Sequence, residues 1–245
     1  KWSPDGTKIA VGFSNPGGCY SPELPDSASV WSATTGKKLF FLFLHLCGFG
    51  NRGPSGIQSL SWRPDGSKIA TGGVDHSAII WSGVTGAKLF TLTAHGYPVG
   101  VVSWSPDGTK VATASFNYGV SNDGVVIVWS ATSGAMHYAL RDHYGEISGI
   151  SWNPEGTKIA TASHDKSVII WSAANGAKLL YFKAFIPGYG SGNKDYGAHW
   201  SPDGTRIAIG GDSSATNIWL VDDLPTTLQE DESDAVFSIV APKEE

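Results

Sequence analysis

Short apolar runs separated by polar turns recur along residues 1–220. Each unit begins with a run that alternates small and large residues and ends in Trp, such as SLSW at 59–62 or GISW at 149–152. A turn such as PEGT at 154–157 follows, in which Pro fixes φ and Gly accepts positive φ. Further β-branched or apolar runs follow, as in KIATA at 158–162 and VIIW at 168–171. No segment keeps a 3.6-residue apolar period over a helix length, so the pattern predicts four short strands per unit.

The ten Trp residues occupy two fixed positions in these units. The first slot, in SW-x-P-(D/E)-G or a close variant, holds Trp2, Trp62, Trp104, Trp152 and Trp200. The second slot, which ends a run such as SVIIW, holds Trp31, Trp81, Trp129, Trp171 and Trp219. The spacings give a basic unit of 42 residues, lengthened by insertions of 10, 8, 6 and 6 residues at four joints. Four strands repeated at this length predict an all-β chain built from the blades of a β-propeller.

The unit SWSPDGTK-(I/V)-ATAS…D…VIIWSA-x-x-G resembles the WD40-repeat family over about residues 1–220. This resemblance implies five recognisable four-stranded blades and leaves open whether they complete the ring. Their expected bounds are about 1–45, 46–95, 96–143, 144–185 and 186–221. The resemblance also implies a hydrogen-bonded set in each blade, made of a His, a Ser or Thr, an Asp and the second-slot Trp. Carried over, the sets are His45, Thr71, Asp75 and Trp81; His95, Thr113, Asp123 and Trp129; and His143, Thr161, Asp165 and Trp171.

The first and last units depart from this pattern. Val11 stands in the Thr position of the first unit, and Ile209 stands in that of the fifth. Phe185 takes the His position that precedes the fifth unit. We therefore expect these two blades to be braced less rigidly. Both Trp slots are interpreted as fold residues, because a buried indole contributes a large apolar surface and one N–H donor.

Function should lie where the copies of the unit differ. The four insertions, at 13–28, 46–57, 116–124 and 185–198, should all emerge on one face of the disc, the narrower top face of the family. They are rich in Gly, Asn, Tyr, Phe and Pro, a composition that suits recognition loops, although tolerated surface excursions remain the alternative. The candidate partner-binding residues are Arg52, Phe116, Tyr118, Tyr189 and Tyr196. Cys19 and Cys47 fall on the same face, where a disulfide and two free thiols are both open.

The formal charge of −5 is concentrated at the end of the chain. Residues 222–245 hold eight acids and one Lys, which leaves the rest of the chain close to neutral. We expect a solvated acidic tail, in which 236–242 either forms a ring-closing strand or begins a further repeat. No basic cluster indicates a nucleic-acid partner. The apolar run Leu39–Leu46 is far shorter than the roughly 20 residues of a membrane helix, so no membrane partner is expected.

No catalytic, cofactor or metal motif stands out in the chain. The seven His residues show no metal-ligand spacing, and no nucleophile elbow or P-loop is present. His143 beside Asp142 could form half of a catalytic dyad, but its repeat position favours bracing. The sequence therefore predicts a non-catalytic scaffold that binds a protein or peptide, or a partner that completes the ring. The alternative is a carbohydrate-binding propeller that stacks exposed aromatic rings on sugars.

Overall fold

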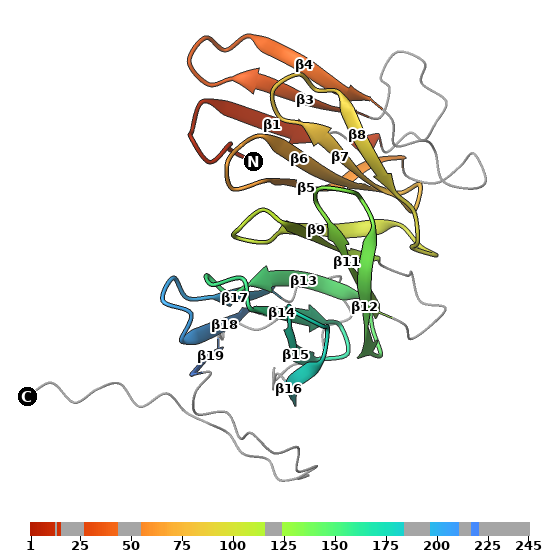
Figure 1. Ribbon diagram of the computed structural model, residues 1–245, viewed down its shortest axis with the longest axis vertical. Coiled ribbons are helices and arrows are strands. Elements are labelled where there is room, and N and C mark those ends of the chain that lie inside the picture. The colour runs from red at the N-terminus through yellow and green to blue at the C-terminus, as the bar shows by residue number, and fades with distance from the viewer. Residues whose placement is uncertain are drawn as a thin grey trace, which may run out of the picture.

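The computed structural model in Figure 1 describes residues 1–12, 14–15, 27–43, 55–115, 124–183, 197–210 and 217–220. Every regular element in these ranges is a β-strand. The strands form five antiparallel sheets that follow one another in chain order, with the first and the fifth sheet at opposite ends of the row (Figure 1). The expected all-β architecture of propeller blades is thus confirmed, and the ring is not closed.

The first two sheets are linked through the first insertion. The first sheet contains β1 (Lys8–Gly12), β3 (Ser27–Ser32) and β4 (Lys38–Phe43), and Trp2 pairs with Ile9 as an isolated bridge. The second contains β2 (Ser14–Asn15), β5 (Ser55–Trp62), β6 (Lys68–Gly73), β7 (Ala78–Ser82) and β8 (Lys88–Leu92). Strand β2 lies within the insertion at 13–28, yet it pairs with β5 of the next sheet, Ser14 opposite Gly56. The first insertion therefore reaches across to the inner strand of the second sheet.

The remaining sheets repeat the same order of strands. The third contains β9 (Val99–Trp104), β10 (Lys110–Ser115), β11 (Gly124–Ser130) and β12 (Met136–His143). The fourth contains β13 (Ile147–Trp152), β14 (Lys158–Ser163), β15 (Ser167–Ser172) and β16 (Lys178–Lys183). The fifth contains β17 (Gly197–Trp200), β18 (Arg206–Gly210) and β19 (Asn217–Leu220). The inner strands β5, β9, β13 and β17 contact one another in succession.

The tight turn after each first-slot Trp is built by its own polar side chains. Between β9 and β10, the Asp107 carboxylate accepts hydrogen bonds from the Thr109 N–H at 2.9 Å and the Thr109 hydroxyl at 2.7 Å. Gly108 has a φ of 66°, a conformation that favours glycine. The Gly108 N–H donates to the carbonyl of Ser105 at 2.9 Å and closes the turn. The same Pro-(Asp/Glu)-Gly pattern recurs in every unit, so the sequence determines where the first strand reverses.

The strand registers bring the strand ends that border all four insertions to one edge of the sheets. Strands β1, β4, β10 and β16 end at this edge, and β3, β5, β11 and β17 begin there. For example, Gly12 lies opposite Ala28, and Ser27 lies opposite Phe43. We call this edge the insertion edge, and the opposite edge, which carries the Pro-(Asp/Glu)-Gly turns, the turn edge.

The hydrophobic core lies between neighbouring sheets. One cluster joins Ala10, Val30 and Leu42 of the first sheet to Ile69 and Trp81 of the second. Alternate residues of each strand serve opposite neighbours, as expected from the two-residue period of a strand. Ile69 therefore packs toward the first sheet, while Ala70, the next residue, belongs to the cluster shared with the third. Each inner sheet is buried on both faces.

Candidate functional site

The structure brings His143, Thr161, Asp165 and Trp171 together in one buried network of the fourth sheet. The indole N–H of Trp171 donates to Thr161 Oγ1 at 2.8 Å, and His143 Nε2 lies 2.7 Å from the same oxygen. On its other side, His143 Nδ1 lies 3.0 Å from Asp165 Oδ2. The network thus runs from the third-strand Trp through the imidazole to a carboxylate at the insertion edge.

Asp165 is the charged end of this network. Its carboxylate also accepts hydrogen bonds from the backbone N–H groups of Tyr144 and Ser167, both at 2.8 Å. Burial alone would raise the pKa of Asp165, but the hydrogen bonds from His143, Ser167 and Tyr144 outweigh it and lower the pKa to about 2. With Nδ1–H donating to this carboxylate, the network assigns Nε2 as the acceptor of the Thr161 hydroxyl. The imidazole therefore joins two elements and has no open nitrogen for a substrate.

Replacing Asp165 with Asn should lower the free energy of unfolding at neutral pH by about 1–3 kcal/mol, because buried donors lose a charged acceptor. The wild-type contribution is complete above the unfolded pKa of 3.8, and it disappears as pH falls toward the folded pKa of about 2. Denaturant titrations between pH 7 and pH 2 measure both effects.

The matched control for this change is Asp142→Asn, since Asp142 precedes His143 directly. Asp142 Oδ2 lies 2.8 Å from Lys178 Nζ, and both side chains are partly exposed. A surface pair of this kind contributes about 0.2–1 kcal/mol. Equal losses in the two variants would contradict the bracing role of Asp165.

The dyad of His143 with Asp142 does not form, because the Asp142 carboxylate is paired with Lys178 and His143 is paired with Asp165.

The other two expected sets fall partly outside the described residues. In the third sheet, Trp129 Nε1 donates to Thr113 Oγ1 at 2.8 Å, and His95 Nε2 lies 2.7 Å from the same oxygen. In the second sheet, Trp81 donates to Thr71 at 2.8 Å. Asp75 accepts a hydrogen bond from the Ser77 N–H at 3.1 Å. The expected partners His45 and Asp123 lie outside the described residues.

In the first sheet, the indole N–H of the second-slot Trp has a hydrogen-bond acceptor that the repeat pattern did not indicate. Trp31 Nε1 donates to Ser29 Oγ at 2.7 Å, on its own strand. Ser29 lies opposite Val11, the residue in the Thr position. The partner has thus moved one strand over, a shift that could have been found by looking for a hydroxyl at the paired position. In the fifth sheet, Ile209 in the Thr position is buried.

The first-slot Trp residues join neighbouring sheets. At three junctions the indole N–H donates to the carbonyl of the residue before the first-slot Trp of the preceding sheet: Trp62 to Lys1 at 3.3 Å, Trp104 to Ser61 at 3.1 Å and Trp152 to Ser103 at 3.4 Å. The buried Trp200 Nε1 has no hydrogen-bond partner among the described residues. A second contact, missed in the sequence, runs the other way at the turn edge. In the first three sheets, the Lys that opens the second strand donates to a carbonyl of the following sheet: Lys8 to Gly83 at 3.0 Å, Lys68 to Ala131 at 2.6 Å and Lys110 to Ala173 at 3.1 Å. We call these three the forward lysines; their fixed place before (I/V)-A was the available signal.

The predicted contact residues at the insertion edge lie outside the described residues, as do both Cys residues and the whole of 221–245. These contact residues are Arg52, Phe116, Tyr118, Tyr189 and Tyr196, and the Cys residues are Cys19 and Cys47. Two described aromatic side chains occupy the same edge, Tyr97 at 37% exposure and Tyr144 at 75%. The ring of His76 lies 6.5 Å from that of Tyr97. Both Tyr residues follow a repeat His within two positions, a signal that the sequence offered.

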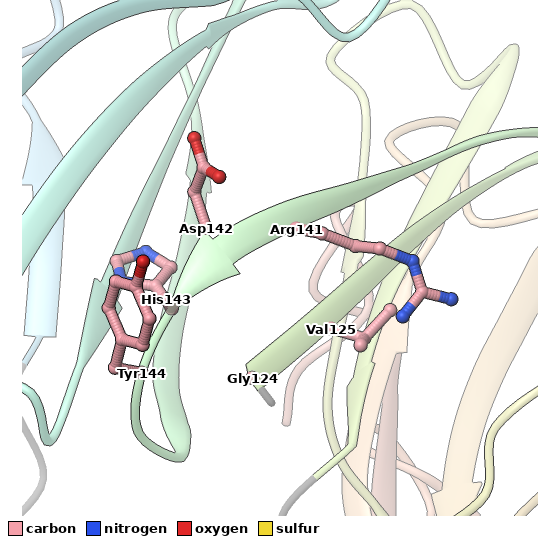
Figure 2. Close-up of a pocket in the computed structure, with 6 residues that line it drawn as sticks. All are labelled: Gly124, Val125, Arg141, Asp142, His143 and Tyr144. Carbon is pink, nitrogen blue, oxygen red and sulfur yellow. The ribbon is translucent and has the colours of Figure 1, made fainter. Parts of the chain in front are cut away.

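A hollow of about 230 Å³ also lies at the insertion edge of the third sheet (Figure 2). It is lined by Gly124, Val125, Arg141, Asp142, His143 and Tyr144. Figure 2 shows Arg141 extending over Val125, away from the side on which His143 and Tyr144 lie. A catalytic centre requires groups that converge on one reacting atom, and these groups diverge.

In the described part of the chain, no group of three or more His, Cys, Asp or Glu residues is arranged to hold a metal ion. Nor does that part contain a helix with the length and apolarity that crossing a membrane requires.

The family model for the WD domain, G-beta repeat (WD40) matches residues 46–82, 86–130 and 134–172. The second match covers β8 to β11, and the third covers β12 to β15. A repeat in the sequence therefore combines the outermost strand of one sheet with the three inner strands of the next. No curated protein matches the chain.

Proposed function

The chain belongs to the WD40-repeat family, and we propose that it is a non-catalytic scaffold that binds a protein or peptide at its insertion edge. Members of this family typically act as scaffolds for protein interactions. The observation that carries the proposal is the register of the strands. It brings the strand ends that border all four insertions to one edge of the sheets, while the turn edge has short turns. This arrangement supports the proposal of a single composite surface.

The described part of that edge has the chemistry of a recognition surface. Tyr97 and Tyr144 are exposed there, and Tyr is enriched in protein interfaces because it combines a large rigid ring with a hydroxyl. The divergent groups of the hollow favour binding over catalysis. The five candidate contact residues in the insertions remain part of the proposal.

The carbohydrate alternative is less well supported. It needs aromatic rings that are free to stack on sugars and that recur from sheet to sheet. The first-slot Trp residues recur, but Trp62, Trp104 and Trp152 are at most 7% exposed. Their indole N–H groups are also taken by carbonyls of the preceding sheet. The insertions, in contrast, differ from one another in sequence, which favours one composite site for a protein.

A phage-displayed library of random peptides, selected on the immobilised chain, tests the proposal. Peptides that bind the insertion edge should lose at least about tenfold in affinity for the variant Tyr97→Ala/Tyr144→Ala, since interface aromatic residues carry much of the binding energy. The matched control is Val84→Ala, because Val84 is 68% exposed at the turn edge. Fluorescence polarisation with labelled peptides measures the affinities.

The same measurements can overturn the proposal. Peptides that keep their affinity for the Tyr variant but lose it for Val84→Ala would place the binding surface at the turn edge. A library without enriched peptides, combined with specific binding on a glycan array, would favour the carbohydrate alternative.

A further inference from the structure

Each junction between neighbouring sheets has two halves, one from each sheet. At each end of the row, the outer face of the last sheet carries one of these halves without its counterpart among the described residues. Among the first four sheets, every junction combines a first-slot Trp that donates backward with a forward lysine that donates forward. The first sheet supplies a forward lysine, Lys8, but its own first-slot Trp2 is 62% exposed. The corresponding Trp62 is 7% exposed. The face of the first sheet that carries Trp2 therefore has the chemistry of a junction, but no neighbouring sheet covers it among the described residues.

Other residues on this face of the first sheet are also more exposed than their counterparts in the second sheet. Ile9 and Trp31 are only half-buried, whereas Ile69 and Trp81, their counterparts in the second sheet, are at most 2% exposed. At the inner junctions an aromatic ring of the preceding sheet packs on a turn glycine, Phe40 on Gly86, Phe90 on Gly134 and Tyr138 on Gly176. Among the described residues, no atom lies within 4 Å of the corresponding position at Gly36. An apolar indole and an open glycine are thus exposed together.

The fifth sheet presents the opposite half of a junction. Ala208 is half-buried, whereas Ala10, Ala70, Ala112 and Ala160, at the same position, are at most 1% exposed. Arg206 stands in the position of the forward lysines and is exposed. His199 directly precedes Trp200, so its carbonyl corresponds to the acceptors Lys1, Ser61 and Ser103 of the inner junctions. The fifth sheet therefore offers an acceptor and a cationic donor.

We propose that these two faces bind each other between copies of the chain, so that the first sheet of one molecule docks on the fifth sheet of another. In this contact the Trp2 indole donates to the His199 carbonyl. The Arg206 guanidinium donates to the Ala33 carbonyl, which is two residues past Trp31, as Gly83 is past Trp81. The contact is a fourth instance of the junction that the row already contains three times.

A second copy is the occupant because the two faces of one molecule lie at opposite ends of the row (Figure 1). The faces differ from each other, so the contact is head-to-tail, and each molecule that joins leaves one face of each kind available. Assembly should therefore grow with protein concentration, or stop where a ring of subunits closes.

Sedimentation velocity on the chain 1–245 over a range of concentrations tests this proposal. The wild type should show a sedimentation coefficient that rises with concentration. Trp2→Ser and Arg206→Glu should each weaken self-association at least about tenfold. Tyr144→Ser is the matched control, because Tyr144 is an aromatic residue that is even more exposed than Trp2 and lies away from both faces. It should behave as the wild type does.

Mixing the two variants gives the sharpest result. Trp2→Ser keeps an intact fifth sheet, and Arg206→Glu keeps an intact first sheet. An equimolar mixture should therefore form a capped heterodimer at concentrations at which each variant alone is monomeric. Because both altered side chains are exposed, circular dichroism should show both variants folded. A wild type that is monomeric at every concentration would overturn the proposal. So would an assembly that both variants retain, or a mixture that stays monomeric.

Discussion

Trp171→Ala should lower the free energy of unfolding by about 3–5 kcal/mol, the range found for truncating a large buried aromatic side chain. Trp171 is 3% exposed and packs with Ile159, Ile169 and Trp152 in the core between the third and fourth sheets. Its loss creates a cavity and removes the N–H that donates to Thr161. Denaturant unfolding followed by circular dichroism measures the change.

The matched control for Trp171 is Trp2→Ala, which removes the same side chain from an exposed position. At low protein concentration this change should cost less than about 1 kcal/mol. Trp171→Phe separates the two contributions, because it keeps much of the apolar surface but leaves the Thr161 oxygen without its indole donor. Similar losses for Trp171→Ala and Trp2→Ala would contradict the assignment of the second slot to the frame of the fold.

His95 should make the protein less stable as pH falls from about 6.5 to about 4. Burial of the imidazole, aided by repulsion from His76, lowers the pKa of His95 from 6.5 to about 4. Between these values the unfolded chain binds a proton that the folded chain does not, so stability is lost as pH falls. The full shift corresponds to a loss of about 3 kcal/mol below pH 4, since each pKa unit is worth about 1.4 kcal/mol.

The variant His95→Gln removes this titration and should flatten the dependence of unfolding free energy on pH between 6.5 and 4. His137→Gln is the control, because His137 is exposed on β12, and it should keep the wild-type slope. The window is separate from that of Asp165, whose contribution is lost below pH 4. An unchanged slope in His95→Gln would mean that the folded chain does not hold His95 neutral in this pH range.

The spacing of the Trp residues was sufficient to predict the sheets, because each unit repeats both the strand pattern and the turn that divides it. Trp171 and Thr161 could be paired from the sequence, since their partnership depends on the register within one sheet. The pairing of β2 with β5 could not, because Ser14 belongs to an insertion that follows no repeat. Nor could the exposure of Trp2, which depends on the presence of a neighbouring sheet rather than on any local residue.

The insertion edge shows a similar limit. Sequence differences between units identified where function should lie, and the register supports a common edge for all four insertions. These sequence differences did not identify Tyr97 or Tyr144, because both residues stand in connections of ordinary length. Residues within the regular repeat were interpreted as fold residues. A side chain one or two positions from a bracing His nevertheless lies at the surface.

The row of sheets, in which each inner sheet shares its core clusters with its two neighbours, resembles a one-dimensional lattice. Opening an end sheet breaks one interface, whereas opening the third sheet breaks two. Fraying should therefore begin at the ends and move inward, so that amide protons of the middle sheet exchange with solvent more slowly than those of the first or the fifth. A contact that covers the end faces would remove this gradient and turn a row that loosens from its ends into a unit that opens all at once.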